Sequence, residues 1–317
     1  MMKEIGGFFE LSFGERGKPY HDAIKLNSGR NALKYILKAS RPDKVYLPYY
    51  ICNSVLEPLN ATGIKYEFYH IDESLEPIFN KALGEKERLL YVNYFGVKDR
   101  TVKALSRKYA NLIIDNTQAF FSKPLKGVDT FYSPRKFFGV ADGGYLYTAK
   151  KLREKIDIDT SYKRYGYLLQ RLDVSASEGY ESFIREENRL KNQPIRIMSK
   201  LTSRILENID YQRVKAIRKN NFLFLHSLLS KINEFDIDVD NLNVPMVYPF
   251  LFSKKGLRDF LIRNKIYVAT YWNEVCARTD RSSLEYRLTK HLLSLPIDQR
   301  YGIYDMKRIY AVIKDFI

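Results

Sequence analysis

The chain has 317 residues, of which 45% are hydrophobic and only 11 are proline, a composition typical of a globular protein with a substantial core and not of a disordered one. The formal net charge of +16 favours anionic partners, while two cysteines and four scattered histidines exclude a disulfide scaffold and a multi-cysteine zinc site. No apolar run approaches the roughly 18 residues that span a membrane, and charges interrupt any signal-peptide core, so we expect a cytoplasmic protein without a membrane partner.

Strand-like and helical segments alternate through the first half of the chain, which is the pattern of a mostly parallel sheet flanked by helices. A helix should begin within residues 27–30, and a strand over 44–47 should end at Pro48. Because each run is rich in β-branched or aromatic residues, further strands are predicted over 65–71, 89–93, 112–115, 130–132 and 145–148.

From about residue 150 the pattern becomes helical and polar, and a long helix is predicted over 199–232. The rest of the chain predicts a small α+β unit, with a strand over 244–252, a helix over 254–264, a strand over 266–271 and a helix over 305–316. We therefore expect a large α/β domain over 1–200, and a bridging helix with a small C-terminal α+β domain over 201–317.

A lysine, Lys136, lies in an unusual segment of aromatic and glycine residues, 21 positions after the acidic end of an apolar strand, Asp115. A carbonyl cofactor needs an amine to hold it as a Schiff base, a buried carboxylate to keep its ring nitrogen protonated, and hydroxyl and N–H donors for its phosphate. Lys136, Asp115 and Ser133 offer one of each. The sequence therefore predicts a pyridoxal 5'-phosphate (PLP) site with Lys136 and Asp115 as catalytic residues.

Further residues are expected to bind the same cofactor. Gln118, three positions after Asp115, would donate to the phenolic oxygen of the ring. The helix that opens at Ser28, Gly29 and Arg30 would attract the phosphate through its N–H groups and its dipole. Tyr50 and Cys52 follow a strand end, where a flat side chain could cover the ring, and no metal is expected.

Each of these assignments has an alternative. Asp115 and Gln118 could form a helix capping box, and residues 27–30 could be a plain capped helix. Tyr50 could be a core aromatic, and Cys52 a buried small residue.

Basic residues concentrate between Arg185 and Lys219. They could form a solvated helix surface or, together with Arg30, Arg135 and Arg196, bind an anionic small substrate such as a diphosphate. Nucleic acid is not expected as a partner, because no nucleic-acid-binding motif accompanies the charge.

These motifs together resemble the DegT/StrS group of fold-type I PLP enzymes, the sugar aminotransferases. The segments that carry the resemblance are the phosphate loop (27–33), the cofactor-stacking segment (48–52), the D-x-x-Q motif (115–118), the lysine loop (136–144) and a C-terminal signature (295–298). The family usually places its phosphate-binding serine five residues before the lysine, where this chain has Phe131, and the family's Asn-Tyr-Arg-Met segment survives only as residues 194–199.

The resemblance implies an aminotransferase that moves an amino group, usually from glutamate, to a keto sugar carried on a nucleotide, in surface-polysaccharide or secondary-metabolite biosynthesis. It also implies a homodimer whose subunits share each active site. Members that replaced the lysine by histidine are dehydratases, so Lys136 argues for transamination. The alternatives are a PLP-dependent lyase, an amino-acid aminotransferase, and a non-catalytic PLP-fold binding protein.

Overall fold

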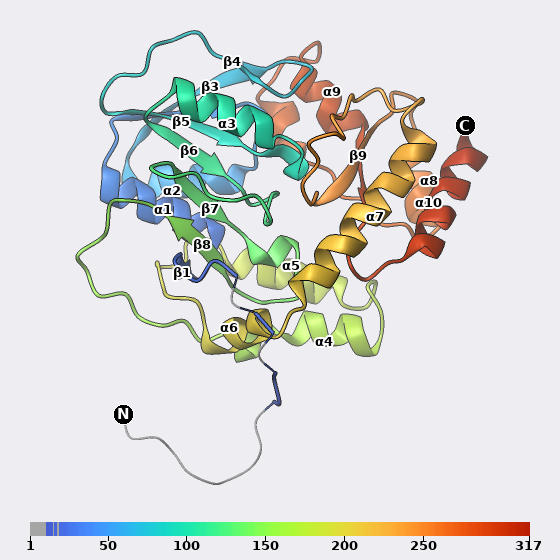
Figure 1. Cartoon of the computed structure of the whole chain (residues 1–317), viewed down its shortest axis with the longest axis horizontal. Helices are drawn as coiled ribbons and strands as arrows, with labels where there is room; N and C mark the ends of the chain where they lie inside the picture. The colour runs from blue at the N-terminus through green and yellow to red at the C-terminus, as the bar shows by residue number, and fades with distance from the viewer. Residues whose placement is uncertain (1–10, 15, 18) are drawn as a thin grey trace.

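A mostly parallel sheet of eight strands forms the centre of the computed structural model, which describes residues 11–14, 16, 17 and 19–317 (Figure 1). The strands lie in the order β1-β8-β7-β6-β5-β2-β3-β4. Their bounds are β1 (Ile24–Leu26), β2 (Lys44–Pro48), β3 (Lys65–Ile71), β4 (Pro77–Ile78), β5 (Glu87–Val92), β6 (Leu112–Asp115), β7 (Asp129–Tyr132) and β8 (Gly144–Tyr147). Neighbouring strands from β7 to β3 pair in parallel, whereas β8, β1 and β4 pair antiparallel.

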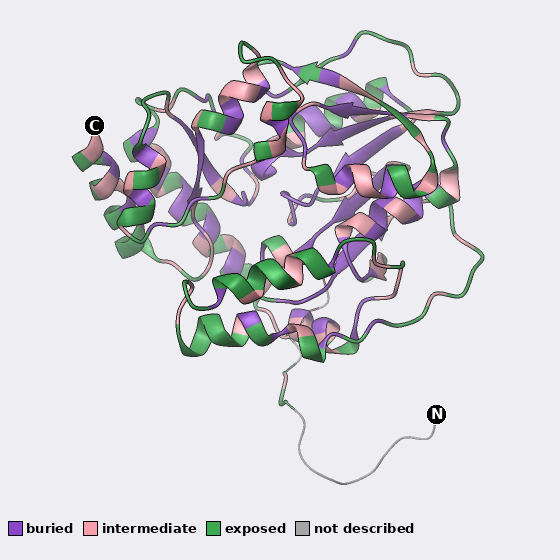
Figure 2. Cartoon of the chain, turned by 180° about the vertical axis from the view of Figure 1, so that it is seen from behind, coloured by how far each residue is buried: buried purple, intermediate pink, exposed green. Residues whose placement is uncertain are grey.

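Helices cover the sheet, so that its inner strands are mostly buried and the outer helix faces are exposed (Figure 2). The helices of this part are α1 (Gly29–Ser40), α2 (Leu56–Thr62), α3 (Asp99–Lys108), α4 (Gly166–Asp173), α5 (Tyr180–Arg189) and α6 (Lys200–Glu207). Short 3-10 helices are η1 (Asn53–Val55), η2 (Tyr94–Gly96), η3 (Pro134–Lys136) and η4 (Tyr162–Arg164). Because β6 is covered on both faces, all four of its residues are buried, as expected for an internal parallel strand.

The first helix shows how local sequence sets an element. Ser28 caps α1 by accepting a hydrogen bond from the backbone N–H of Asn31, and four apolar side chains, Ala32, Leu33, Ile36 and Leu37, form its buried face. The helix ends at Arg41, which is left-handed and precedes Pro42, a residue that cannot continue a helix.

The C-terminal part is built on an antiparallel pair, β9 (Val247–Leu251) and β10 (Leu292–Pro296). Its remaining elements are α7 (Tyr211–Leu229), α8 (Leu257–Arg263), η5 (Asn273–Ala277), α9 (Leu284–His291) and α10 (Ile303–Phe316). In Figure 1, α7 runs between the region of the large sheet and this smaller α+β unit. No helix in the described part of the chain is both long and apolar enough to cross a membrane.

Two predicted elements of the second half were wrong. The helix expected over 199–232 is two helices, α6 and α7, because Asp210 accepts a hydrogen bond from the N–H of Arg213 and starts a new helix. The segment 266–271 is not a strand. Ile266 and Val268 are buried there by packing, and only Ala269 forms an isolated bridge, with Ser294.

Candidate active site

The carboxyl end of β6 presents Asp115, and the described residues 116–128 that follow form turns and loops without a helix. The Asp115 Oδ1 atom accepts a hydrogen bond from the backbone N–H of Thr117 at 2.8 Å. Since no helix begins here, the interpretation of Asp115 as a helix cap does not hold. Its buried carboxylate is instead held at the edge of the sheet where parallel α/β folds bind ligands.

Lys136 ends η3, in the loop between β7 and β8, and reaches the turn that follows Asp115. Its Nζ atom donates to the Thr117 hydroxyl at 2.9 Å. Burial raises the pKa of the Asp115 carboxyl, while the Lys136 charge and the hydrogen bonds of Thr117 oppose that rise. Thr117 therefore binds both groups, and the folded chain brings the predicted amine and carboxylate together.

The start of α1 lies against the same turn. A Cβ atom on Gly29 would lie 3.2 Å from Thr117 Cγ2 and 3.7 Å from Ser133 Cβ. The first N–H groups of a helix have no partner within the helix and carry its positive dipole end, so they attract a phosphate. Gly29, at the start of α1, and the buried Ser133 therefore lie close to Thr117, the residue that binds Lys136, and Ser28 caps the helix.

The glycine pair at the end of the lysine loop, Gly143 and Gly144, packs against the start of α1. A Cβ atom on Gly144 would lie 2.5 Å from the backbone oxygen of Ser28, a distance that no real side chain tolerates. Gly143 has φ of +128°, and its N–H donates to the Asn27 backbone oxygen at 2.8 Å. The pair lets β8 pass directly against the start of α1.

Gln118 contributes an unpaired donor. The side chain is fully buried, and its Oε1 atom accepts the backbone N–H of Phe95 at 2.9 Å. Its Nε2 atom has no hydrogen-bond partner among the described residues. A buried amide N–H without an acceptor costs free energy.

Tyr50 and Cys52 are the other two residues predicted to contact the cofactor. Tyr50 is fully buried, with its ring centroid 5.7 Å from that of Tyr94 and 5.1 Å from that of Trp272. Cys52 starts η1, where its Sγ atom accepts the N–H of Ser54 at 3.4 Å. Within the described residues, no hydrogen bond or ring contact joins Tyr50 or Cys52 to Lys136, and their contact with the cofactor stays a prediction.

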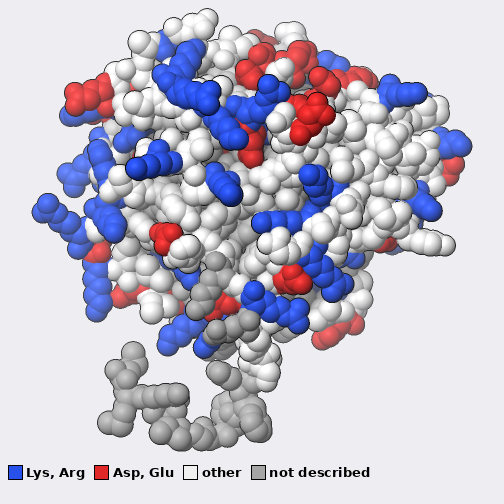
Figure 3. All heavy atoms as spheres, in the orientation of Figure 1, with Lys and Arg blue, Asp and Glu red and all other residues white. Residues whose placement is uncertain are grey.

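The arginines considered for phosphate binding are engaged in ion pairs, Arg30 with Glu57, Arg135 with Glu187 and Arg196 with Asp159. In Figure 3, Lys and Arg are scattered over the visible face with acidic side chains among them.

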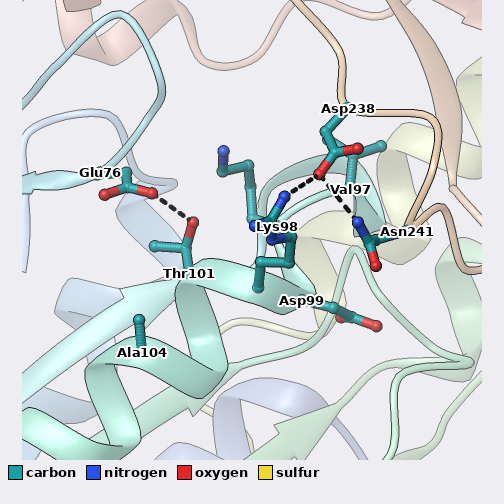
Figure 4. A pocket seen from close by; sticks show the side chains of 9 residues that line it. Glu76, Val97, Lys98, Asp99, Thr101, Ala104, Asp238 and Asn241 are labelled. Atoms are coloured by element: carbon teal, nitrogen blue, oxygen red, sulfur yellow. Dashed lines mark hydrogen bonds and ion pairs between the residues drawn. The ribbon is translucent and has the colours of Figure 1, made fainter.

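A separate cavity of about 330 Å³ lies between the start of α3 and the segment 238–241 (Figure 4). Its charged walls pair with one another, since Arg100 contacts Asp238 at 2.9 Å and Thr101 donates to Glu76 at 2.9 Å. Neither Lys136 nor Asp115 lines it. No group of three or more metal-binding side chains occurs in the described part of the chain.

The sequence interpretation did not include Thr117. A hydroxyl within the D-x-x-Q motif, next to an acid and within reach of the lysine loop, was the available signal. Only the folded chain shows that this hydroxyl binds Lys136 while its N–H binds Asp115.

Comparison with known proteins shows the fold. No family model and no curated protein matches the sequence. Three similar solved structures are the sugar aminotransferase CalS13 from Micromonospora echinospora, a DegT DnrJ EryC1 StrS aminotransferase from Brucella abortus, and NtdA from Bacillus subtilis with bound cofactor PMP.

CalS13 superposes with a TM-score of 0.66 at 14% identity, over 92% of this chain and 87% of that one. The Brucella protein has a TM-score of 0.62 at 16% identity, over 93% and 85% of the two chains. NtdA has a TM-score of 0.63 at 14% identity, over 92% and 73%. The predicted fold class, a fold-type I PLP-dependent transferase fold with a mostly parallel sheet and a small C-terminal α+β part, is confirmed.

Proposed function

We propose that this chain is a PLP-dependent aminotransferase that moves an amino group to a keto sugar. The observation that carries the proposal is the convergence of Lys136 and Asp115 on Thr117, beside the start of α1. The proposal is further supported by the fold, which this chain shares with CalS13, a sugar aminotransferase, and with NtdA, which binds PMP.

The residues present fit the cofactor. The Nζ atom of Lys136 would be the amine that binds its carbonyl carbon, and the buried Asp115 carboxylate would be the partner of its ring nitrogen. The start of α1 and Ser133 would hold the phosphate. The unpaired Nε2 atom of Gln118 would donate to the phenolic oxygen, which gives that atom the acceptor it lacks.

Lys136, Asp115 and Thr117 would have different roles in amino transfer. When bound, PLP supplies the electron sink that stabilises negative charge on the substrate carbon next to the amine. The Nζ atom of Lys136 would be the base that takes the proton from that carbon and the acid that gives it back. Asp115 keeps the ring nitrogen protonated, and Thr117 orients both groups.

We further propose the finer features that the family resemblance implies. These are glutamate as the donor, a nucleotide-linked keto sugar as the acceptor, a homodimer, a cytoplasmic location and a role in polysaccharide or secondary-metabolite biosynthesis. The net charge of +16 supports an anionic acceptor.

Borohydride reduction of the PLP-loaded protein, followed by peptide mapping, tests the proposal. We expect the pyridoxyl group on Lys136 and loss of labelling in Lys136→Ala, with normal labelling in the exposed control Lys126→Ala. In a panel of keto sugars and amino donors, Lys136→Ala should lose amino transfer by at least about 10²-fold, the lower end for a positioned proton-transfer group. A label on another lysine, or a protein that remains colourless with PLP, would contradict the proposal.

A further inference from the structure

Arg218 is an unusual residue because it is a buried cation that forms no salt bridge with any carboxylate of the described residues, although Asp298 lies close enough to influence its pKa. It lies on α7 and is 1% exposed. Among the described residues its hydrogen bonds go to neutral oxygens, those of the Gln299 side chain and of the Pro245 and Met246 backbone. Burying a charge is expensive unless the surrounding groups compensate it, so a chain that keeps an arginine here uses it for something that an apolar side chain cannot do.

One set of contacts leads from Arg218 to the lysine loop. The Arg218 Nε atom donates to Gln299 Oε1 at 2.9 Å, and the Gln299 Nε2 atom donates to the Phe137 backbone oxygen at 2.7 Å. The guanidinium carbon also lies 4.6 Å from the centroid of the Phe137 ring. We call these contacts, from Arg218 through Gln299 to Phe137, the first arm. Since Phe137 follows Lys136 directly, the first arm holds the peptide that positions the Lys136 side chain.

A second set of contacts leads to Gln118. An Arg218 NH1 atom donates to the Met246 backbone oxygen at 3.0 Å, and the Met246 N–H donates to the Phe95 backbone oxygen at 2.8 Å. The Phe95 N–H in turn donates to Gln118 Oε1 at 2.9 Å. This arm therefore fixes the face of the Gln118 amide and directs its unpaired Nε2 atom.

We propose that Arg218 is a positioning residue that holds the lysine loop and the Gln118 amide in register, so that Nζ of Lys136 and Nε2 of Gln118 meet one bound cofactor. The inference rests on the proposed function for the identity of that cofactor, but its geometry belongs to the protein alone. In the view of Figure 1, α7, the helix that carries Arg218, lies between the large sheet and the C-terminal unit.

The arginine side chain suits this role for a physical reason. A guanidinium carries five donors in a rigid plane and stacks on aromatic faces, so it can bind two backbone oxygens, an amide and a ring at once. Burial lowers the pKa of Arg218 to about 10, with Asp298 opposing and Arg300 adding to the effect, so the side chain stays charged at neutral pH. A neutral isostere would leave those oxygens without donors.

Hydrogen–deuterium exchange of the full chain, with and without PLP, tests the proposal in Arg218→Met. We expect exchange to accelerate by about tenfold in peptides that cover residues 93–97 and 134–139, the effect of losing a hydrogen bond to a charged donor. Peptides of β3 should stay within about twofold of the wild type. The affinity for PLP should fall by about tenfold.

The matched control is Lys219→Met, which removes the same charge from the next, exposed position of α7. It should leave both the exchange pattern and the PLP affinity unchanged. Unchanged exchange at 93–97 and 134–139 in Arg218→Met would overturn the inference. Equal acceleration in all peptides would also overturn it, because Arg218 would then contribute only to global stability.

A second variant separates the two arms and serves if Arg218→Met does not fold. Gln299→Glu keeps an acceptor for Arg218 but loses the donor to the Phe137 oxygen. It should accelerate exchange at 134–139 and leave 93–97 unchanged, whereas acceleration of both segments or of neither would overturn the two-arm arrangement. Failure of the wild type to bind PLP would refute the proposed function, and the exchange pattern would still decide the role of Arg218.

Discussion

The side-chain carboxylate of Asp115 is buried, with little access to solvent. Burial raises the pKa of its carboxyl, and the opposing Lys136 charge and Thr117 hydrogen bonds do not cancel that effect. A group whose pKa is higher in the folded than in the unfolded chain costs stability as pH rises above its ordinary value of 3.8. The buried charge of Asp115 therefore destabilises the folded chain, and a protonated ring nitrogen would neutralise it.

Replacement of Asp115 by Asn tests whether the carboxylate supports amino transfer and whether its charge destabilises the folded protein. Amino transfer should fall by at least about a hundredfold, as expected when a preorganised charge is removed from a site. The cofactor-free variant should melt at a higher temperature than the wild type at pH 7, and the difference should shrink as pH falls toward 3.8. Near-normal turnover, or a lower melting temperature at pH 7, would argue against this role.

Gly144 has no room for a side chain, because the backbone of Ser28 lies directly beside it. An added methyl group would meet the Ser28 backbone oxygen at 2.5 Å and push the start of α1 away from Ser133. We expect Gly144→Ala to lose about 1–3 kcal/mol of stability, the usual cost of overpacking, and to bind PLP more weakly. Gly166→Ala is the control, since its methyl group would meet nothing within 4 Å. Thermal melts measure the stability of both variants, and PLP titrations measure their affinity. Equal values for the two variants would contradict the prediction.

Among the elements, the loop that carries Lys136 and helix α6 depend on each other. The buried Asp142 accepts hydrogen bonds from the N–H of Ser199 at 2.8 Å, from the Ser199 hydroxyl at 2.8 Å, and from the Thr202 hydroxyl. Ser199 is also the cap of α6. The carboxylate thus ties the glycine end of the lysine loop to the helix that follows residues 194–198.

Asp142→Asn should therefore destabilise the protein by about 2–3 kcal/mol, because an amide turns a donor toward the donors of Ser199 and Thr202. Asp157→Asn, an exposed change of the same kind in the segment between β8 and η4, should cost about 0.5 kcal/mol or less. Urea denaturation of the two variants measures the difference. Equal midpoints would show that Asp142 is not the connection between these elements.

At the scale of the molecule, α4 and α5 expose an apolar face. Its most exposed side chains are Leu169, Leu172, Val174 and Tyr180, which are 57–81% accessible. Soluble monomers seldom expose large contiguous apolar patches, so this face suits the homodimer that we propose.

Leu172→Glu is expected to convert the dimer into a monomer, because a buried carboxylate is costly at an apolar interface. Tyr304→Glu is the matched control, since Tyr304 is 89% exposed on α10, away from this face. Light scattering of the wild type and both variants gives the result. A monomeric wild type would refute the dimer, and an unchanged dimer in Leu172→Glu would place the interface elsewhere.

The sequence alone was sufficient to predict the alternating strands and helices. It was also sufficient to place Asp115, Ser133 and Lys136 in one hypothetical PLP site. Those features depend on local pattern: apolar strands, a cap at Ser28, and an acid at a strand end. The C-terminal strand over 266–271 was predicted wrongly because apolar composition cannot distinguish a paired strand from a packed loop.

Only the tertiary structure decided the rest. It showed that no helix follows Asp115, that Thr117 joins Asp115 to Lys136, and that Arg30 pairs with Glu57. It also brought Arg218 to Gln299, 81 positions away in the chain. Sequence patterns report the periodicity of an element, whereas the partner of a buried polar group is set by which distant segments the packed core brings within about 3 Å.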